Sequence, residues 1–246
     1  MRSTMVVALA VVAAMLGWVC QARADSVTLD SVADTALRGN SQQYNYGWED
    51  SIHVQNKWQD RTVLIRFDLP ANFAGATVNS ATLRLDVYDT YFTDGTVNAY
   101  RSLQPWVEGP ASQTWDAPAN WRIYDYGQGW NTYGALGSGS DYDNSEVASA
   151  SYLYGFTGWM SFDVAALVDN WADNSAVNHG FELLAGSVDV IVRSYSKEGE
   201  AAASGNAPEL ILDYTPGGVI PEPGTLLLIG SGVVGLFGLA RRRRTK

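Results

Sequence analysis

Short segments in which apolar and polar residues alternate fill the chain from Asp25 to Tyr214. Gly, Asn, Asp and Pro residues separate these segments, and helical periodicity is nearly absent. Side chains of a strand alternate between its two faces, so this pattern is typical of antiparallel sheets with one face in a core. We therefore expect an all-β fold, a single jelly-roll β-sandwich over residues 25–215.

Ten segments carry the alternation most clearly. In one of them Leu83, Leu85 and Val87 are expected to face the core, with the residues between them facing solvent. A short helix is predicted from Val164 to Trp171, because apolar residues there recur every three or four positions and Asp163 stands at the expected N-cap. The predicted strands are 26–29, 35–38, 51–54, 63–68, 81–88, 97–101, 159–163, 180–184, 188–195 and 209–214.

The N-terminus has the pattern of a cleavable secretion signal over residues 1–24. Arg2 precedes an apolar run, and Ala22-Arg23-Ala24 forms a small-x-small cleavage site. The alternatives are a membrane anchor, for which about 16 apolar residues are short, and a lipoprotein site at Cys20, where Trp18 fits poorly. Cleavage after Ala24 removes the single cysteine, so the mature protein is expected to contain no disulfide.

The C-terminus has three parts in a fixed order. A linker over residues 216–224 contains Pro221, Glu222 and Pro223, an apolar stretch suited to a transmembrane helix covers residues 225–240, and a basic tail covers residues 241–246. The tail contains Arg241, Arg242, Arg243 and Arg244. A plain membrane anchor is the alternative to a sorting signal.

This order resembles the PEP-CTERM sorting signal of Gram-negative bacteria. The resemblance covers about the last 28 residues. It implies recognition by an exosortase of the inner membrane, cleavage near Pro221-Glu222-Pro223, and a host that makes exopolysaccharide. The protein would then cross the inner membrane and reach the cell envelope, outer surface or extracellular matrix, touching the membrane only through residues 225–240 before processing.

Residues 60–70, 76–85 and 114–118 resemble the DNRLRE domain family, and so do Phe162-Asp163-Val164 through Trp171, residues 180–184 and residues 206–210. The resemblance implies a jelly-roll domain of secreted and surface proteins, some of which bind polysaccharides such as alginate. The segment 120–158 is longer and more aromatic than the resemblance leads us to expect.

The charge of the mature domain limits its partners. Residues 25–215 hold nine Lys and Arg against 25 Asp and Glu, a net charge of about −16. Such a charge repels nucleic acid and anionic membrane surfaces, and it disfavours a polyanionic ligand whose charge is not compensated locally.

Five aromatic residues in a glycine-containing loop are the predicted carbohydrate-binding residues. Aromatic faces stack on the C–H groups of a pyranose while nearby polar groups bond its hydroxyls. The alternative is that these rings pack over one end of the sandwich. The five are Trp121, Tyr124, Tyr126, Trp130 and Tyr133.

A calcium site is considered in the Gly-Ser loop that follows. Asp141, Asp143, Asn144 and Glu146 place four oxygen-bearing side chains within six residues, the chemistry that Ca²⁺ prefers. The spacing is not that of an EF-hand, and ordinary solvation of an acidic loop is the alternative. No cofactor is otherwise expected.

No catalytic residue is predicted. His53 and His179 have neither a zinc spacing nor a nucleophile elbow nearby, and both are expected at strand ends or on the surface. A glycosidase pair among the many carboxylates stays open, because such pairs are defined in space. Arg61, Arg66 and Arg84 are each expected to pair with an acidic neighbour.

These observations favour an exported, non-catalytic envelope or matrix protein that contacts extracellular polysaccharide through its aromatic loop. Two alternatives stay open. One is a structural or adhesive surface protein with protein partners, and the other is a polysaccharide hydrolase or lyase.

Overall fold

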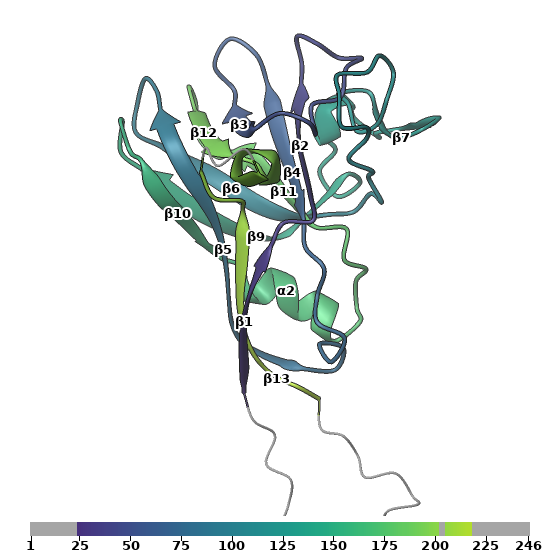
Figure 1. Ribbon diagram of the computed structural model, residues 1–246, viewed down its shortest axis with the longest axis vertical. Coiled ribbons are helices and arrows are strands. Elements are labelled where there is room, and N and C mark those ends of the chain that lie inside the picture. The colour runs from purple at the N-terminus through teal and green to yellow at the C-terminus, as the bar shows by residue number, and fades with distance from the viewer. Residues whose placement is uncertain (1–23, 202–204, 218–246) are drawn as a thin grey trace, which may run out of the picture. The chain divides into compact units, whose positions relative to one another are not determined.

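The computed structural model describes residues 24–201 and 205–217. Within them the chain is an antiparallel β-sandwich with short helices, which confirms the predicted all-β sandwich (Figure 1). Eleven strands form one sheet in the order β1-β13-β5-β12-β3-β4-β11-β6-β9, with β10 paired to β5 and β2 paired to β4. Its strands are β1 (Asp25–Asp30), β2 (Ala33–Arg38), β3 (Ser51–Gln55), β4 (Arg61–Arg66), β5 (Thr77–Thr90), β6 (Gly95–Ser102), β9 (Tyr142–Tyr152), β10 (Gly158–Asp163), β11 (Phe181–Ala185), β12 (Ile191–Tyr195) and β13 (Glu209–Thr215).

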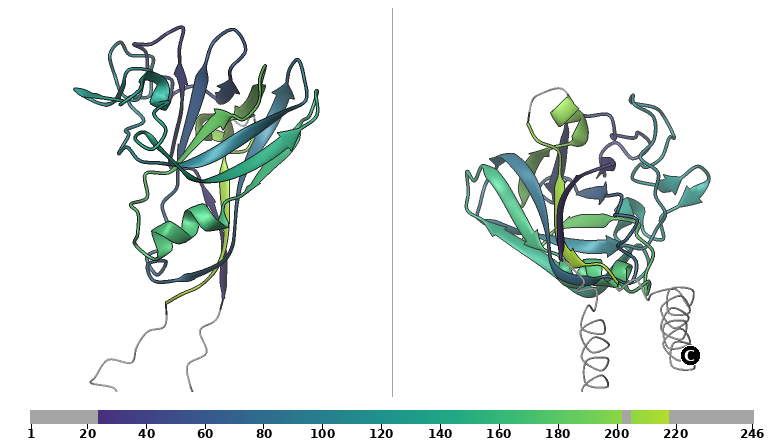
Figure 2. Two further views of the ribbon diagram at one scale, coloured as in Figure 1. Left: turned by 180° about the vertical axis from the view of Figure 1, so that it is seen from behind. Right: turned by 60° about the horizontal axis from the view of Figure 1, so that its bottom comes forward.

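The sheet curls back on itself to enclose its main core (Figures 1 and 2). Irregularities in the pairing of β5 with β12 and β13, and of β6 with β9, help it bend, because a bulge increases local twist. Outside the sheet lie a hairpin of β7 (Ile123–Asp125) and β8 (Gln128–Gly129), the 3-10 helix η1 (Tyr133–Ala135), and the helices α2 (Ala165–Ala172) and α3 (Lys197–Ala201).

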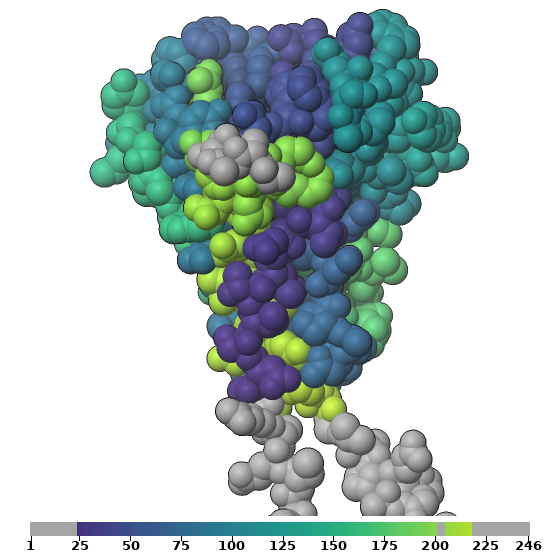
Figure 3. Space-filling model, viewed as in Figure 1, coloured from purple at the N-terminus to yellow at the C-terminus, as the bar shows by residue number. Residues whose placement is uncertain are grey.

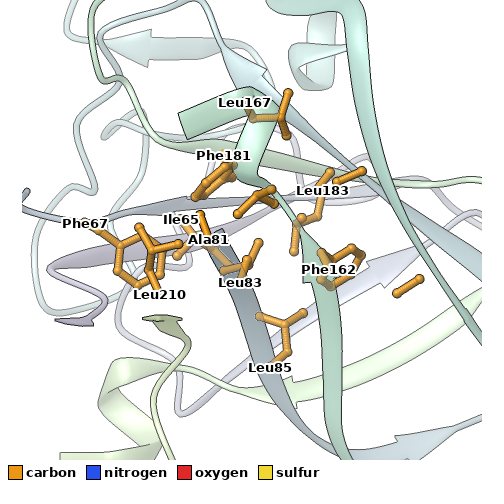
Figure 4. Close-up of a cluster of buried hydrophobic side chains, with 14 of the residues drawn as sticks. Ile65, Phe67, Ala81, Leu83, Leu85, Phe162, Leu167, Phe181, Leu183 and Leu210 are labelled. Atoms are coloured by element: carbon orange, nitrogen blue, oxygen red, sulfur yellow. The ribbon is translucent and has the colours of Figure 1, made fainter. Parts of the chain in front are cut away.

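The long strand β5 shows the expected alternation. Leu83, Leu85 and Val87 are almost completely buried, whereas the residues between them are half-buried. Figure 4 shows Leu83 and Leu85 gathered with Phe162 of β10 and other apolar side chains of the core. Leu83 pairs with Phe162 on one side and with Leu210 of β13 on the other, so the buried face of β5 continues across its neighbours.

Three local predictions are corrected by the structure. The segment predicted as an acidic Gly-Ser loop is largely strand β9, which starts at Tyr142. Val164, not Asp163, is the N-cap of α2, although the Asp163 carboxylate still accepts a hydrogen bond from the Ala165 N–H at 3.2 Å. The strand predicted from Val188 starts only at Ile191, because residues 186–189 form a turn.

The two ends of the domain lie side by side. β1 pairs with β13 so that Asp25 lies opposite Tyr214, and Figure 3 shows this purple strand against the yellow-green one. Both core clusters and all pairings described lie within residues 25–215. The described part of this segment packs as one compact unit.

No helix within the described residues is long and apolar enough to cross a membrane. The predicted signal peptide up to Arg23 and the predicted sorting helix at 225–240 lie outside those residues, as do Pro221, Glu222, Pro223 and the four arginines from Arg241 to Arg244.

Candidate functional site

The two tryptophans of the aromatic loop are core residues. Trp121 and Trp130 are only 7% and 5% exposed and belong to a second apolar cluster with Leu37, Leu64 and others. The Trp130 indole N–H donates to the Asn120 carbonyl at 2.8 Å. Because their ring faces are covered, the structure supports the packing alternative for these two residues.

The three tyrosines of the loop do not form one platform. Tyr126 and Tyr133 are 67% and 50% exposed, whereas Tyr124 packs against Trp130 with ring centroids 5.5 Å apart. The guanidinium of Arg122 lies 5.6 Å from the Tyr133 ring. Two exposed rings thus remain here, and they do not pack against each other.

Three of the four side chains considered for calcium have other partners, and the fourth is exposed. The buried Asp141 carboxylate accepts hydrogen bonds from the backbone N–H groups of Asn131, Thr132 and Gly137 at 2.8, 2.8 and 3.0 Å, which fixes the loop above the second core cluster. Asp143 pairs with Arg101, Glu146 accepts from Asn170 at 3.0 Å, and Asn144 is exposed. The structure does not bring these groups together, and calcium binding there stays a prediction.

The arginine predictions are only partly confirmed. Arg84 pairs with Glu209, as expected. Arg66 instead donates to the Trp106 carbonyl at 3.0 Å and lies over the Trp106 ring. Arg61 donates to Nδ1 of His53 at 2.7 Å, and no carboxylate of the described residues lies within ion-pair distance of either Arg61 or Arg66.

The position of His53 leads to a surface that sequence reasoning missed. His53 is central in β3, not at a strand end, and it pairs with Arg193 of β12. Because the adjacent Ile52, Val54 and Val192 face the core, His53 and Arg193 share the outer face. We call this the arginine–tyrosine face; its members are Arg38, His53, Arg61, Tyr88, Arg193 and Tyr195.

Ring contacts and hydrogen bonds connect the members of this face. Nε2 of His53 lies 3.2 Å from the Tyr88 hydroxyl, and the Tyr88 and Tyr195 rings pack with centroids 4.9 Å apart. Arg38 pairs with Glu49, and Arg193 lies 3.6 Å from Asp89. Arg61 differs from these two arginines, because it has no carboxylate partner in the described part of the chain. Its guanidinium is within hydrogen-bond reach of two neutral side chains, His53 and Gln59.

Three arginines gather on this face although the domain as a whole is acidic, and their charges act on one another and on His53. Burial, and then the charges of Arg61, Arg38 and Arg193, lower the pKa of His53 to about 3, so its ring is neutral at physiological pH. Burial and the charge of Arg61 lower the pKa of Arg38 to about 10, and burial and Arg193 lower that of Arg61.

Three exposed aromatic residues adjoin this face. We call Trp58, Tyr91 and Phe92 the aromatic tip. The Trp58 and Phe92 rings meet edge to face with centroids 4.7 Å apart, and Arg193 lies 4.7 Å from the Tyr91 ring, which connects the tip to the face. Trp58 is 75% exposed and Phe92 45%. Their loops, between β3 and β4 and between β5 and β6, lie at the end of the domain opposite its two termini (Figure 1).

Backbone conformation holds the aromatic tip in place. Trp58 and Phe92 have φ angles of 65° and 74°, in the left-handed region that bulky residues avoid. Such conformations cost about 1–3 kcal/mol each and cluster at binding sites. Lys57 adds two contacts to this arrangement. Its ammonium lies 5.6 Å from the centre of the Phe92 ring and 2.9 Å from the Asp189 carboxylate.

A hollow of about 240 Å³ lies beside Arg61. Its lining combines polar residues, among them Gln55, Asp60 and Thr62, with the apolar Leu136 and Leu184. A sugar ring needs this mixture, because it presents both hydroxyls and C–H groups. The sequence offered one signal for this site, since Trp58 and Phe92 stand in polar turns. Sequence alone could not bring them together with the arginines, because these residues come from segments far apart in the chain.

Two segments of the chain match models of known families. Residues 25–126 match the model of carbohydrate-binding module family 96, and residues 219–244 match the PEP-CTERM protein-sorting motif. No curated protein matches the chain. The name DNRLRE stays a resemblance, since the matching model is described as family 96.

The family 96 match includes the whole aromatic tip and all of the arginine–tyrosine face except Arg193 and Tyr195. The structural domain extends beyond the match to Thr215, because β12 and β13 pair with β5. The PEP-CTERM motif indicates export to the cell envelope or extracellular surface and processing by an exosortase.

Proposed function

We propose that the exported domain is a non-catalytic module that binds extracellular polysaccharide on the aromatic tip and the arginine–tyrosine face. The observation that carries the proposal is the exposed Trp58 and Phe92 pair, next to Tyr91, whose ring lies 4.7 Å from Arg193 of the arginine–tyrosine face. Exposed rings offer stacking surface for pyranose rings at low entropic cost. The family 96 match supports carbohydrate as the ligand class.

The charge of the face favours a polysaccharide that carries carboxylates. The guanidinium of Arg61 can donate two parallel hydrogen bonds to a carboxylate, which neutral hydroxyls cannot match. The net charge of the domain disfavours polyanions at long range, whereas the local field at Arg61 acts within a Debye length, about 8 Å at physiological salt. We therefore place the selectivity for acidic sugars at Arg61.

The non-catalytic part of the proposal rests on the histidines. His53 is neutral because of its low pKa and is hydrogen-bonded to Arg61 and Tyr88, and burial also lowers the pKa of His179. Neither has the environment of a general acid. Release of reducing sugar from a bound polysaccharide would contradict this part.

Affinity electrophoresis of the 25–216 domain tests the proposal. Gels would contain either the acidic exopolysaccharide of the host or the same polymer after carboxyl reduction. We expect retention by the acidic polymer, lost in Arg61→Gln but kept in Arg122→Gln, a control that removes an arginine beside Tyr133. Equal retention by both polymers would overturn the acidic-sugar assignment, and no retention by either would overturn carbohydrate binding at this face.

A further inference from the structure

Three carboxylates from separate segments meet at one point of the domain. Asp34 comes from β2, Glu108 from the loop after β6, and Glu198 from α3, and one oxygen of each lies within 4.8 Å of the others. We call these three residues the acidic cluster. Asp34 is 1% exposed, whereas the side chains of Glu108 and Glu198 are 20% and 27% exposed. The acidic cluster is thus closed on the side of Asp34 and reachable from solvent on the other.

Hydrogen bonds occupy only part of the cluster. Oδ2 of Asp34 accepts from the Ser31 hydroxyl at 3.1 Å and from the Lys197 backbone N–H at 2.9 Å. Oε1 of Glu108 accepts from the Asp34 N–H at 2.7 Å and from the Lys197 ammonium at 2.6 Å. The same ammonium pairs with Oε1 of Glu198.

Two carboxylate oxygens remain without a donor. Oδ1 of Asp34 and Oε2 of Glu198 are both buried and have no hydrogen-bond partner among the described residues. Buried polar atoms are nearly always paired, and an unpaired buried carboxylate oxygen is costly. Within the described segments Lys197 is the one ammonium in contact with the acidic cluster, so three carboxylates share a single cationic partner.

We infer that the acidic cluster binds one divalent cation, with Ca²⁺ preferred, through Asp34, Glu108 and Glu198. The two unpaired oxygens are available as ligands, and a cation would supply the partner that both lack. Ca²⁺ prefers carboxylate oxygens and tolerates irregular geometry, whereas Mg²⁺ demands a near-ideal octahedron. This site is separate from the segment 141–146 and from the arginine–tyrosine face.

The cation would reinforce the hydrogen bonds that already join three parts of the fold. β2, the loop after β6 and α3 each contribute one carboxylate, so a bound ion holds all three in place. A ligand that binds only the folded state raises its stability in proportion to the logarithm of its concentration over Kd. Saturation at about 100 times Kd should raise Tm by roughly 5–10 °C in a domain of this size.

Calorimetric titration of the EDTA-treated 25–216 domain with CaCl₂ or MgCl₂ alone tests the inference. Thermal melts at up to about 10 mM of each salt accompany it, because extracellular calcium modules have Kd values of about 10⁻⁴–10⁻³ M. We expect one Ca²⁺ per domain and the Tm increase given above. Glu108→Gln and Glu198→Gln should lose both, and Glu146→Gln, a change of the same kind in the segment first considered for calcium, should keep both.

Three results would overturn the inference: no heat and no change in Tm with either salt, loss of binding in Glu146→Gln instead of the cluster variants, or binding of Mg²⁺ without Ca²⁺. The titration of the unmodified domain decides the matter even if a cluster variant fails to fold.

Discussion

Trp58 and Phe92 belong to different loops, yet their rings meet edge to face at 4.7 Å while both remain exposed. An apolar pair of this size on a surface usually has a partner, and both residues hold left-handed backbone conformations to form it. Arg193 lies 4.7 Å from the ring of Tyr91, which precedes Phe92 in the chain. The proposed site for an acidic sugar chain rests on this combination of exposed rings and a nearby arginine.

The strand register of β5 predicts opposite outcomes for adjacent residues. Leu85→Asp should prevent folding, because an unpaired buried carboxylate costs several kcal/mol against a total stability of about 5–15 kcal/mol. Arg84→Ser should be milder, since it removes a half-buried pair with Glu209. Thermal melts of both variants check this, and the reverse order would contradict the register.

Trp130 is predicted to act on stability and not on binding. Trp130→Ala removes a buried ring and should cost about 3–5 kcal/mol, which lowers Tm by roughly 6–20 °C. Tyr126→Ala removes a ring that is 67% exposed and should change Tm by only a few degrees. A calorimetric melt of each variant suffices. Equal Tm values for the two would show that the Trp130 ring is not core.

Much of the fold was predictable from the sequence, and the site was not. Alternation fixes the faces of a strand locally, so the spacing of Leu83, Leu85 and Val87 was enough to assign them to the core. Strand β9 was missed because its first residues carry Asp143, Asn144 and Glu146, which suggest a loop, whereas its pairing with β6 is a tertiary contact.

The residues of the proposed site were not predicted, for a related reason. Aromatic density along the chain pointed to Trp121 and Trp130, but whether a ring is core or platform depends on what covers it, and here the second core cluster does. Arg61, His53 and Arg193 meet only through the pairing of β3 with β12 and of β3 with β4. Such an assembly leaves no spacing in the sequence.

The buried Glu182 predicts a stability that falls as pH rises. Both of its carboxyl oxygens lack a partner among the described residues, and burial, then Asp141, raise its pKa well above the usual value of 4.5. Between the usual pKa of 4.5, which applies to the unfolded state, and the raised pKa of the folded state, the folded state binds more protons. The free energy of unfolding therefore decreases as pH rises through this range.

Glu182→Gln should therefore stabilise the domain at pH 7, because the neutral amide does not have to take up a proton on folding. Its stability should also change less between pH 5 and pH 8. Urea unfolding at several pH values measures both effects, with Glu146→Gln as the control. A variant less stable than the wild type at pH 7 would indicate that Glu182 is ionised and paired.

The two end signals predict the mass of the mature protein. Cleavage after Ala24 and near Pro221-Glu222-Pro223 should leave a chain without either apolar segment. Intact-mass measurement of protein recovered outside the cell checks this. A mass that retains Arg241 to Arg244 would contradict exosortase processing.

The most direct test of the proposed binding site compares two pairs of exposed rings. The double variant Trp58→Ala with Phe92→Ala should lose at least tenfold in affinity for the acidic exopolysaccharide, about 1.4 kcal/mol, because central aromatic residues dominate such surfaces. The matched control, Tyr126→Ala with Tyr133→Ala, should bind as the wild type does, and all three proteins should melt within a few degrees of one another. Affinity electrophoresis would contradict the account if the first pair kept its binding while folded, or if only the control pair lost it.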